Sequence, residues 1–248
     1  MGNVGQTQGI WPQSAVVFGA SGGIGRALTE ALAQRGVERV YAGSRSAIDF
    51  ENKAIVPFTF DLTDEASIET VAQGMRDAPP KLVLVATGVL TLADGTGPER
   101  SYKRLDPAAM EQVLRLNTIG PALIAKHMLP LFPRESRAVF AALSARVGSI
   151  SDNHIGGWHS YRASKAALNM LVRNWAIEMG RTHKDAVVVS LHPGTVATSL
   201  SEPFQSNLPD GQLTSPEDAA ANLLGVIDGL TPDDSGFQFD WKGERVPD

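Results

Sequence analysis

Short apolar runs of strand length alternate with longer segments of helical periodicity along this chain. The runs lie at residues 14–18, 37–43, 55–60, 81–86, 137–143 and 186–191, with a last strand near 236–241. Between most of them apolar residues recur at helical spacing, at 26–35, 65–76, 107–132, 158–181 and 215–228. Strands that are apolar throughout are typical of a parallel sheet covered on both faces. The pattern therefore predicts an α/β fold with an open, mostly parallel sheet.

Two segments depart from this pattern. The helical stretch 107–132 contains Gly120 and Pro121 shortly after Asn117. Glycine and proline inside a helix usually kink it and free backbone carbonyls, so we predict a kink at Asn117. Residues 195–214 form the longest stretch without clear periodicity. Such loops in compact domains are usually lids or binding loops, and we expect this one to cover a ligand.

The composition fits one globular domain spanning residues 1–248. The chain is 43% hydrophobic and 20% charged, and it has no internal repeat or low-complexity linker. Alternating α/β chains of about 250 residues often form a single domain. The net charge is -5, and no basic cluster is visible. This argues against a nucleic-acid partner, which requires a clustered basic surface.

Several site classes and locations are disfavoured by what the chain lacks. It has no cysteine, which excludes disulfides and thiolate metal sites and fits a reducing cytoplasm. His127, His183 and His192 show no metal-ligand spacing with carboxylates, and loop histidines such as His154 and His159 are more often solvated, so we predict no metal. Residues 1–13 lack the basic start and apolar run of a secretory signal. No apolar stretch reaches the roughly 18 residues that span a membrane, and we expect a cytoplasmic protein without a membrane partner.

A glycine-rich turn follows the first predicted strand. Gly19, Gly23 and Gly25 lie between this strand and the first helix, where backbone N–H groups approach a phosphate closely. The second strand ends in Ser44 and Arg45, with no carboxylate. At this place in a dinucleotide-binding fold an arginine accommodates a 2′-phosphate. The residues favour NADP over NAD; the alternative interpretation of Arg45 is a solvent-exposed loop residue.

Tyr161 and Lys165 lie four residues apart in the long predicted helix 158–181. This spacing puts them one turn apart on one helical face, close enough for the ammonium to act on the phenol. A nearby positive charge lowers the pKa of a phenol, which is ordinarily about 10. Taken alone, such a pair is more often a packed tyrosine and a solvated lysine.

These motifs, in this order, resemble the short-chain dehydrogenase/reductase family over nearly the whole chain. The residues that carry the resemblance are Gly19, Gly23, Gly25, Asp61, Gly88, Asn117, Tyr161, Lys165, Pro193, Gly194 and Thr198. Within the family, residues 148–150, 156–161 and 236–241 look like the branch of C-factor-like and sniffer-like carbonyl reductases. The resemblance implies a Rossmann-type doubly wound sheet of about seven strands. It also implies a homodimer or homotetramer that associates through the helices containing Asn117 and Tyr161.

The resemblance further implies hydride transfer between a nicotinamide cofactor and a carbonyl or alcohol substrate. Tyr161 would be the general acid for reduction, Lys165 would lower its pKa and bind the nicotinamide ribose, and Asn117 would help order a water. The remaining implied cofactor contacts are Ser21 and Ile24 at the pyrophosphate, Asp61 and Leu62 at the adenine, and Val196 and Thr198 at the carboxamide.

Three positions depart from the family pattern. Phe18 replaces a threonine before the first loop glycine, and residues 85–88 read Val-Ala-Thr-Gly where the family has Asn-Asn-Ala-Gly. The family serine that binds the substrate carbonyl lies three residues before a glycine, which here is Ala145, and Ser144 lies one residue earlier. Adjacent strand residues face opposite ways, so either a bulge re-aims Ser144 or the site works without that hydroxyl. We favour Ser144, with Ser149 as the alternative donor.

The leading hypothesis is an NADP-preferring carbonyl reductase or alcohol dehydrogenase with a small or medium apolar substrate under the loop 195–214. A second hypothesis is a signalling or regulatory protein on the same fold whose catalysis is weak, because a fold does not determine function. A third, an epimerase or dehydratase, is disfavoured because such relatives generally have longer substrate domains.

Overall fold

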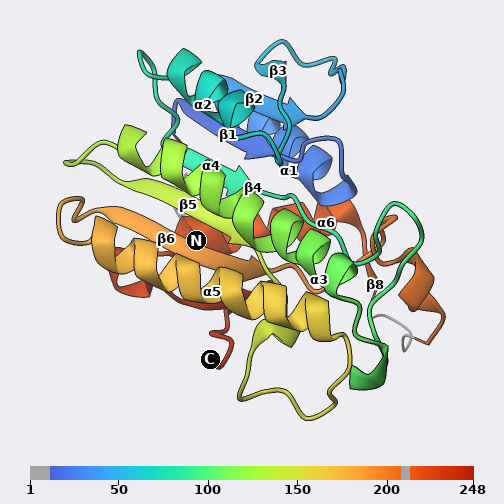
Figure 1. The fold of residues 1–248 in the computed structure, drawn as a ribbon. Helices are drawn as coiled ribbons and strands as arrows, with labels where there is room; N and C mark the ends of the chain where they lie inside the picture. Colours follow the sequence, from blue (N-terminus) through green and yellow to red (C-terminus); the bar gives the residue numbers. More distant parts are fainter. Residues whose placement is uncertain (1–11, 208–212) are drawn as a thin grey trace, which may run out of the picture.

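A seven-stranded parallel sheet forms the centre of the molecule (Figure 1). The computed structural model describes residues 12–207 and 213–248. The strands are β1 (Ser14–Phe18), β2 (Arg39–Ser44), β3 (Ile55–Thr59), β4 (Leu82–Val85), β5 (Ala138–Leu143), β6 (Ala186–His192) and β9 (Gln238–Asp240). Their order is β3-β2-β1-β4-β5-β6-β9. The strand order reverses between β1 and β4, and ligands of such sheets bind beyond the carboxyl ends at this point.

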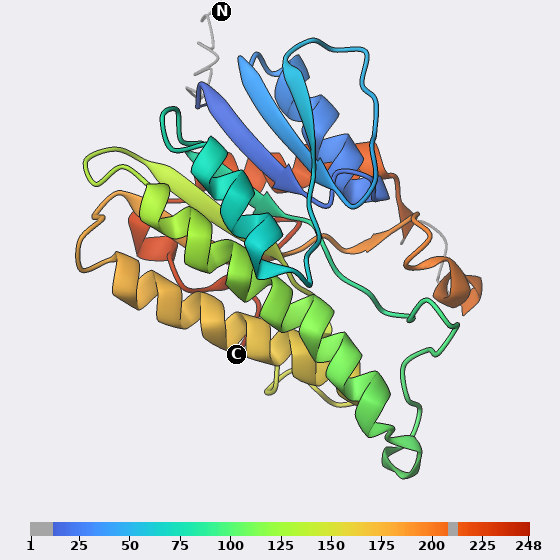
Figure 2. The ribbon, with the colours of Figure 1, turned by 45° about the horizontal axis from the view of Figure 1, so that its top comes forward.

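Helices cover both faces of the sheet, as the apolar strands predict. The helices α1 (Gly23–Gln34) and α6 (Pro216–Gly229) pack on one face. The other face is covered by α2 (Glu65–Gly74), α4 (Gly120–Met128) and α5 (His159–Met179), which lie side by side in Figures 1 and 2, with α3 (Pro107–Leu114) continuing the line of α4. Side chains of β5 alternate between the two cores: Val139 and Ala141 face α1 and α6, whereas Phe140 and Ala142 face α5.

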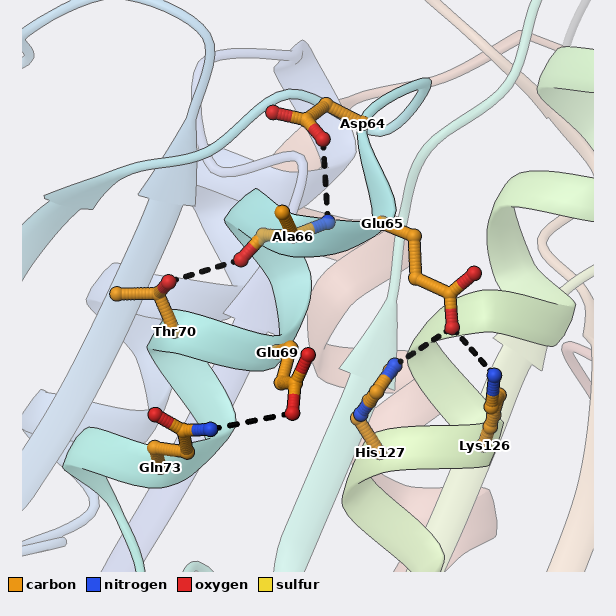
Figure 3. A network of polar contacts seen from close by, with 8 residues as sticks. All are labelled: Asp64, Glu65, Ala66, Glu69, Thr70, Gln73, Lys126 and His127. Atoms are coloured by element: carbon orange, nitrogen blue, oxygen red, sulfur yellow. Dashed lines mark hydrogen bonds and ion pairs between the residues drawn. The ribbon is translucent and has the colours of Figure 1, made fainter.

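A polar network joins the start of α2 to α4 (Figure 3). The Asp64 carboxylate accepts a hydrogen bond from the Ala66 N–H and caps α2. The Glu65 carboxylate meets Lys126 and lies 3.1 Å from His127 Nε2. Hydrogen bonds from Lys126 and then His127 lower the pKa of Glu65. These contacts hold the start of α2 against α4 at the protein surface.

The interruption predicted at Asn117 is present, but its geometry differs from the predicted kink. A π-helical turn, Arg115–Ile119, joins α3 to α4 within one continuous helical rod. A Cβ atom on Gly120 would lie 2.4 Å from the Leu62 side chain. Gly120 is therefore needed because Leu62 packs too closely for a side chain at this position. The π-helical turn accommodates the backbone next to Pro121.

The segment 195–214 contains more regular structure than expected. Thr195–Val196 (β7) pairs in parallel with Leu213–Thr214 (β8), and Glu202–Asn207 form a 3-10 helix. The expectation of an irregular loop was therefore wrong for the first and last two residues of the segment. There β7 and β8 pair through their backbones and hold the two ends of the segment together. The middle of the segment, 208–212, lies outside the described residues.

The two edge strands of the sheet differ from the inner ones. Phe60 directly follows β3, and its N–H donates to the Ser44 carbonyl of β2 at 2.9 Å. Successive N–H groups alternate in direction, so Pro57 occupies an outward-facing position. On β9, Phe239 forms an antiparallel bridge with Arg245, and Val246 N–H donates to Gln238 at 2.9 Å.

Within the described ranges, no helix is both long and apolar enough to cross a membrane.

Candidate active site

The glycine turn after β1 brings three backbone segments into close contact. Gly19 has φ of 94°, and a Cβ atom there would lie 2.9 Å from the Ala86 carbonyl. A Cβ atom on Gly25 would lie 2.1 Å from the Gly19 carbonyl oxygen. The residue before α1, Gly22, offers no side-chain cap. The first N–H groups of α1 consequently remain available to an acceptor from outside the helix.

The segment after β6 closes over this turn. A Cβ atom on Gly23 would lie 2.6 Å from Thr198 Cγ2. Val196, two residues before Thr198, is buried and belongs to β7. Gly194 has φ of 79° and packs against Trp241. The structure thus brings together the predicted glycine turn and the predicted segment 193–198, although they are far apart in sequence.

Arg45 and Asp61 follow the adjacent strands β2 and β3, and β2 is joined to the start of the turn by hydrogen bonds from Gly19 N–H and Ala20 N–H to the Gly43 carbonyl. Hydrogen bonds from the Thr63 N–H and hydroxyl lower the pKa of Asp61, and the charge of Arg45 adds to the effect. Arg45 is exposed. The Leu62 side chain is buried in the core, which leaves only its backbone for a ligand.

Tyr161 and Lys165 are both buried on the first two turns of α5. The Lys165 ammonium donates to the Leu143 carbonyl at 2.9 Å and lies 5.8 Å from the centre of the Tyr161 ring. Burial lowers the pKa of Lys165 to about 8 and raises the pKa of Tyr161 to about 12. For Tyr161 this direction is opposite to the sequence prediction, because burial removes the phenol from water and disfavours its charged form.

Asn117 meets the same site from the π-helical turn. Its amide donates to the Val89 carbonyl at 2.8 Å and to Ser164 Oγ at 3.1 Å, and its oxygen accepts from the Val89 N–H at 2.8 Å. A Cβ atom on Gly88 would lie 3.2 Å from Asn117 Oδ1 and 3.4 Å from Lys165 Nζ. Gly88, Asn117 and Lys165 are therefore packed together. The water that Asn117 was expected to order stays a prediction.

Ser144 follows β5 without a bulge in the β5–β6 ladder. The pairing continues through Leu143 and Leu191, and Ser144 N–H donates to Leu191 at 2.8 Å. The expected bulge is therefore not needed, because strand alternation alone directs Ser144 toward the face covered by α5, the face of Phe140 and Ala142. Ser144 Oγ is buried and has no hydrogen-bond partner. Ser149 Oγ instead accepts from Asp152 N–H at 3.1 Å within its own loop.

Sequence reasoning missed two further polar groups at the strand ends. Thr87 Oγ1, beyond β4, and His192 Nδ1, at the end of β6, are buried without a hydrogen-bond partner. Burial lowers the pKa of His192 to about 4. Together with Ser144 Oγ, they place one unpaired polar atom at the carboxyl end of each of the adjacent strands β4, β5 and β6. Buried polar atoms are nearly always paired in proteins, so these three mark places where a ligand or water would supply partners. The signal in the sequence was a polar residue directly after each apolar run.

An aromatic wall stands beside Tyr161. The Trp158 ring meets the Tyr161 ring edge-on, with 6.1 Å between centres, and packs on Phe204 at 5.1 Å. Phe204 also lines a cavity of about 460 Å³ between the β4–α3 connection and the start of the 3-10 helix 202–207. A larger cavity, of about 1290 Å³, lies at the amino ends of β1 and β4. Tyr161 lines neither cavity; the smaller one is linked to it through the rings of Phe204 and Trp158. We place the candidate site at Tyr161 and the neighbouring strand ends, on the side of the sheet nearest the smaller cavity.

Over residues 12–207 and 213–248, no group of three or more histidine, aspartate or glutamate side chains is arranged to hold a metal ion.

Comparison with known proteins identifies relatives over most of the chain. The model of the family described as short chain dehydrogenase matches residues 13–209. The 1-hydroxy-2-glutathionyl-2-methyl-3-butene dehydrogenase of Rhodococcus sp. (strain AD45) is 34% identical over 227 residues, which cover 90% of this chain and 94% of that protein. C-signal of Myxococcus xanthus is 38% identical over 143 residues, covering 58% of this chain and 81% of that protein.

Solved structures share the fold along nearly the whole length. An NADPH-bound carbonyl reductase from chicken fatty liver has a TM-score of 0.80 and 24% identity, with 97% of each chain covered. The carbonyl reductase Sniffer of D. melanogaster has a TM-score of 0.80 and 20% identity, covering 95% of this chain and 99% of that one. At these identities the likeness concerns the fold, and it confirms the predicted doubly wound sheet.

Proposed function

This chain belongs to the short-chain dehydrogenase family, and from that premise we propose that it is an NADP-dependent carbonyl reductase or alcohol dehydrogenase. One observation carries the proposal: Tyr161, Lys165 and Asn117 meet at the carboxyl ends of the strands, next to a glycine turn that leads into an uncapped helix. Tyr161 is the proposed general acid and base of the reaction.

The residues fit a dinucleotide cofactor. Side chains are excluded at Gly19 and Gly25 by contacts under 3 Å, and the first N–H groups of α1 are free to bind a pyrophosphate. We propose that Gly19, Ser21, Gly23, Ile24 and Gly25 bind the pyrophosphate, Arg45 the 2′-phosphate, Asp61 and Leu62 the adenine, and Gly88, Pro193, Gly194, Val196 and Thr198 the nicotinamide end. When bound, the nicotinamide supplies or accepts the hydride. NADP is favoured over NAD by Arg45 and by the absence of a carboxylate directly after β2.

In the proposed mechanism for reduction, Tyr161 donates its proton to the substrate oxygen. Its pKa of about 12 keeps the phenol protonated at neutral pH, as a donor must be. Lys165, with a pKa of about 8, is mostly cationic at neutral pH and stabilises the phenolate that remains. Ser144, whose buried hydroxyl lacks a partner, is the proposed second donor to the carbonyl, and Ser149 is the alternative.

The substrate class that the site favours is a small or medium apolar carbonyl or alcohol. Trp158 and Phe204 provide an apolar wall next to Tyr161. The Rhodococcus relative is named as a dehydrogenase of a glutathionyl alcohol. A substrate panel should therefore include thioether alcohols together with simple aliphatic and aromatic ketones.

Substitution of one oxygen tests the assignment. We expect Tyr161→Phe to retain the buried ring and lose NADPH oxidation on every carbonyl that the unchanged protein reduces. Tyr102→Phe is the matched control, since Tyr102 is 69% exposed. Equal rates for Tyr161→Phe and the unchanged protein would contradict the proposed role.

A second candidate function is a cofactor-binding signalling or regulatory protein with weak catalysis. The similarity to C-signal favours it, as does Ala145 at the position where the family has its serine. Tight binding of NADPH in a fluorescence titration, without turnover across the panel, would select this function over the first.

We further propose that two or four copies associate through α4 and α5. Ile119, Met170 and Ile177 are large apolar side chains on this helical layer, and each is about half exposed or more. Met170 and Ile177 lie seven residues apart and therefore on one face of α5, and an exposed apolar patch of this kind is typical of an interface. A cytoplasmic location stays a prediction from the sequence.

A further inference from the structure

The helix that carries Tyr161 begins without a cap of its own. Trp158 occupies the N-cap position of α5, and its side chain accepts no hydrogen bond. Its φ of 50° makes it the only described residue other than glycine with a positive φ. Bulky side chains avoid this left-handed region. The start of α5 therefore needs outside contacts, both to satisfy its N–H groups and to keep Trp158 in a strained conformation.

Glu99 supplies those contacts from the connection between β4 and α3. Its backbone carbonyl accepts from Trp158 N–H at 2.5 Å. Its carboxylate accepts from Ser160 N–H at 3.1 Å and also from the Ser160 hydroxyl. Glu99 precedes Ser160 by 61 residues. Glu99 thus binds Trp158 and Ser160, the residues on either side of His159, where α5 begins. It replaces the cap that the Trp158 side chain does not provide.

The carboxylate is ionised at neutral pH. Burial opposes its charge, but the hydrogen bond from the Ser160 hydroxyl, further backbone hydrogen bonds and the nearby His159 together hold the pKa of Glu99 below its ordinary value. A negative charge at the amino end of a helix is favourable because the helix dipole is positive there. Glu99 is therefore well suited to fix the first turn of α5.

This first turn contains the proposed acid. Tyr161 directly follows Ser160, and its ring contacts Trp158 edge-on. Phe204 packs on the same indole and, together with Glu99, lines the cavity of about 460 Å³. We propose that Glu99 is a positioning residue, which sets the place of the Tyr161 phenol by holding Trp158 and Ser160. The inference rests on the proposed function, in which Tyr161 donates the proton.

A comparison of three variants tests this role. Glu99→Ala removes the carboxylate, Glu99→Gln keeps an oxygen that accepts from Ser160 N–H, and Glu111→Ala is a control at an exposed glutamate of α3. Misplacement of a reacting group by about 1 Å costs on the order of 100-fold in rate. We expect Glu99→Ala to lower kcat by roughly 10-fold to 100-fold. NADPH affinity should stay within about twofold, Glu99→Gln should recover most of the loss, and Glu111→Ala should match the unchanged protein.

A second readout does not depend on turnover. Tryptophan labelled with fluorine gives a Trp158 resonance that a Trp158→Phe variant identifies. We expect this resonance to shift or broaden in Glu99→Ala and to stay in place in Glu111→Ala. If Glu99→Ala does not fold, Ser160→Ala, which removes only the hydroxyl contact, is compared in the same two measurements.

The outcomes separate the inference from the proposed function. A Glu99→Ala protein with unchanged kcat, or with lowered kcat and an unmoved Trp158 resonance, overturns the positioning role. So does equal loss in Glu99→Ala and Glu99→Gln. Failure of the proposed function has a different signature, because Tyr161→Phe would then turn over substrate as fast as the unchanged protein.

Discussion

Asn117 and Val89 are joined by a reciprocal pair of hydrogen bonds, each 2.8 Å long, between one side-chain amide and one backbone peptide position. Asn117 is fully buried, and Val89 lies 28 residues earlier in the chain. The pair anchors the segment after β4 to the π-helical turn. Gly88, which precedes Val89, is in turn packed against Lys165. Asn117 therefore positions the backbone of Gly88 and Val89, which packs beside the Lys165 ammonium.

Truncation of this amide should destabilise the fold. Asn117→Ala leaves the half-buried N–H and carbonyl of Val89 without their partners, and a fully buried unpaired group of this kind costs about 1–3 kcal/mol. We expect the free energy of unfolding in urea to fall by roughly 2–5 kcal/mol. Asn52→Ala is the control, because Asn52 is exposed and its side chain makes one local hydrogen bond, to Ala54 N–H. Equal unfolding midpoints for the two variants would contradict the anchoring role of Asn117.

The glycine turn gives a second prediction. Gly25→Ala would place a Cβ atom 2.1 Å from a backbone oxygen, so the turn must deform. We expect NADPH binding, measured by fluorescence titration, to weaken by more than about tenfold. Gly225→Ala in α6 is a matched helical control whose new Cβ atom meets nothing within 4 Å. That control should bind NADPH normally and be slightly more stable, because alanine favours a helix over glycine.

Cofactor preference should depend on Arg45. A charge-assisted hydrogen bond contributes about 1.5–3 kcal/mol, which corresponds to a change in affinity of roughly tenfold or more. We expect Arg45→Gln to raise the Kd for NADPH by about that factor and to leave the Kd for NADH nearly unchanged. Arg39→Gln, at the other end of β2, controls for the loss of one positive charge. A parallel loss of affinity for both cofactors would show that Arg45 does not recognise the 2′-phosphate.

Lys165 should make stability depend on pH. Its pKa is about 8 in the folded protein and 10.5 in the reference state, so between these values the unfolded chain binds a proton that the folded protein does not. Stability therefore rises with pH across this window, by on the order of 3 kcal/mol in total. We expect a Lys165→Met variant to lack the rise in denaturant unfolding between pH 8 and 10. Tyr161 has the opposite effect above pH 10, because burial raises its pKa to about 12. Parallel stability curves for the two proteins would contradict this account.

The two serines near the end of β5 can be separated by substitution. We expect Ser144→Ala to lower kcat by about tenfold or more, because one donor to the developing oxyanion is lost. Ser149→Ala should change kcat little, because its hydroxyl already accepts from Asp152 N–H and donates to the backbone oxygen of Asp248. The reverse order of effects would assign the second donor to Ser149.

The sheet was predictable because its determinants are local in sequence. The strands β4 and β5 are apolar along almost their whole length, and only a sheet with two covered faces buries such runs. The glycine turn, Arg45 and the pair Tyr161 and Lys165 were found in the same way, since strand ends and helical spacing determine where they lie.

The features that sequence reasoning missed depend on tertiary contacts. The neighbouring lysine indicated a lowered pKa for Tyr161, but the burial that reverses this direction appears only in the fold. Gly120 and Pro121 suggested a kink, whereas the packed Leu62 explains the glycine and a π-helical turn accommodates the proline. Glu99 carries no motif, and its partner Ser160 is remote in sequence.

The edges of the sheet bear on how this protein behaves at high concentration. An exposed edge strand can recruit a strand from another molecule and template aggregation. Here Pro57 removes an outward-facing donor from β3, and residues 244–246 occupy the outer side of β9. Both ends of the sheet are thereby protected against intermolecular strand addition. The proposed association through α4 and α5 accordingly leaves both edges of the sheet out of the contact between copies.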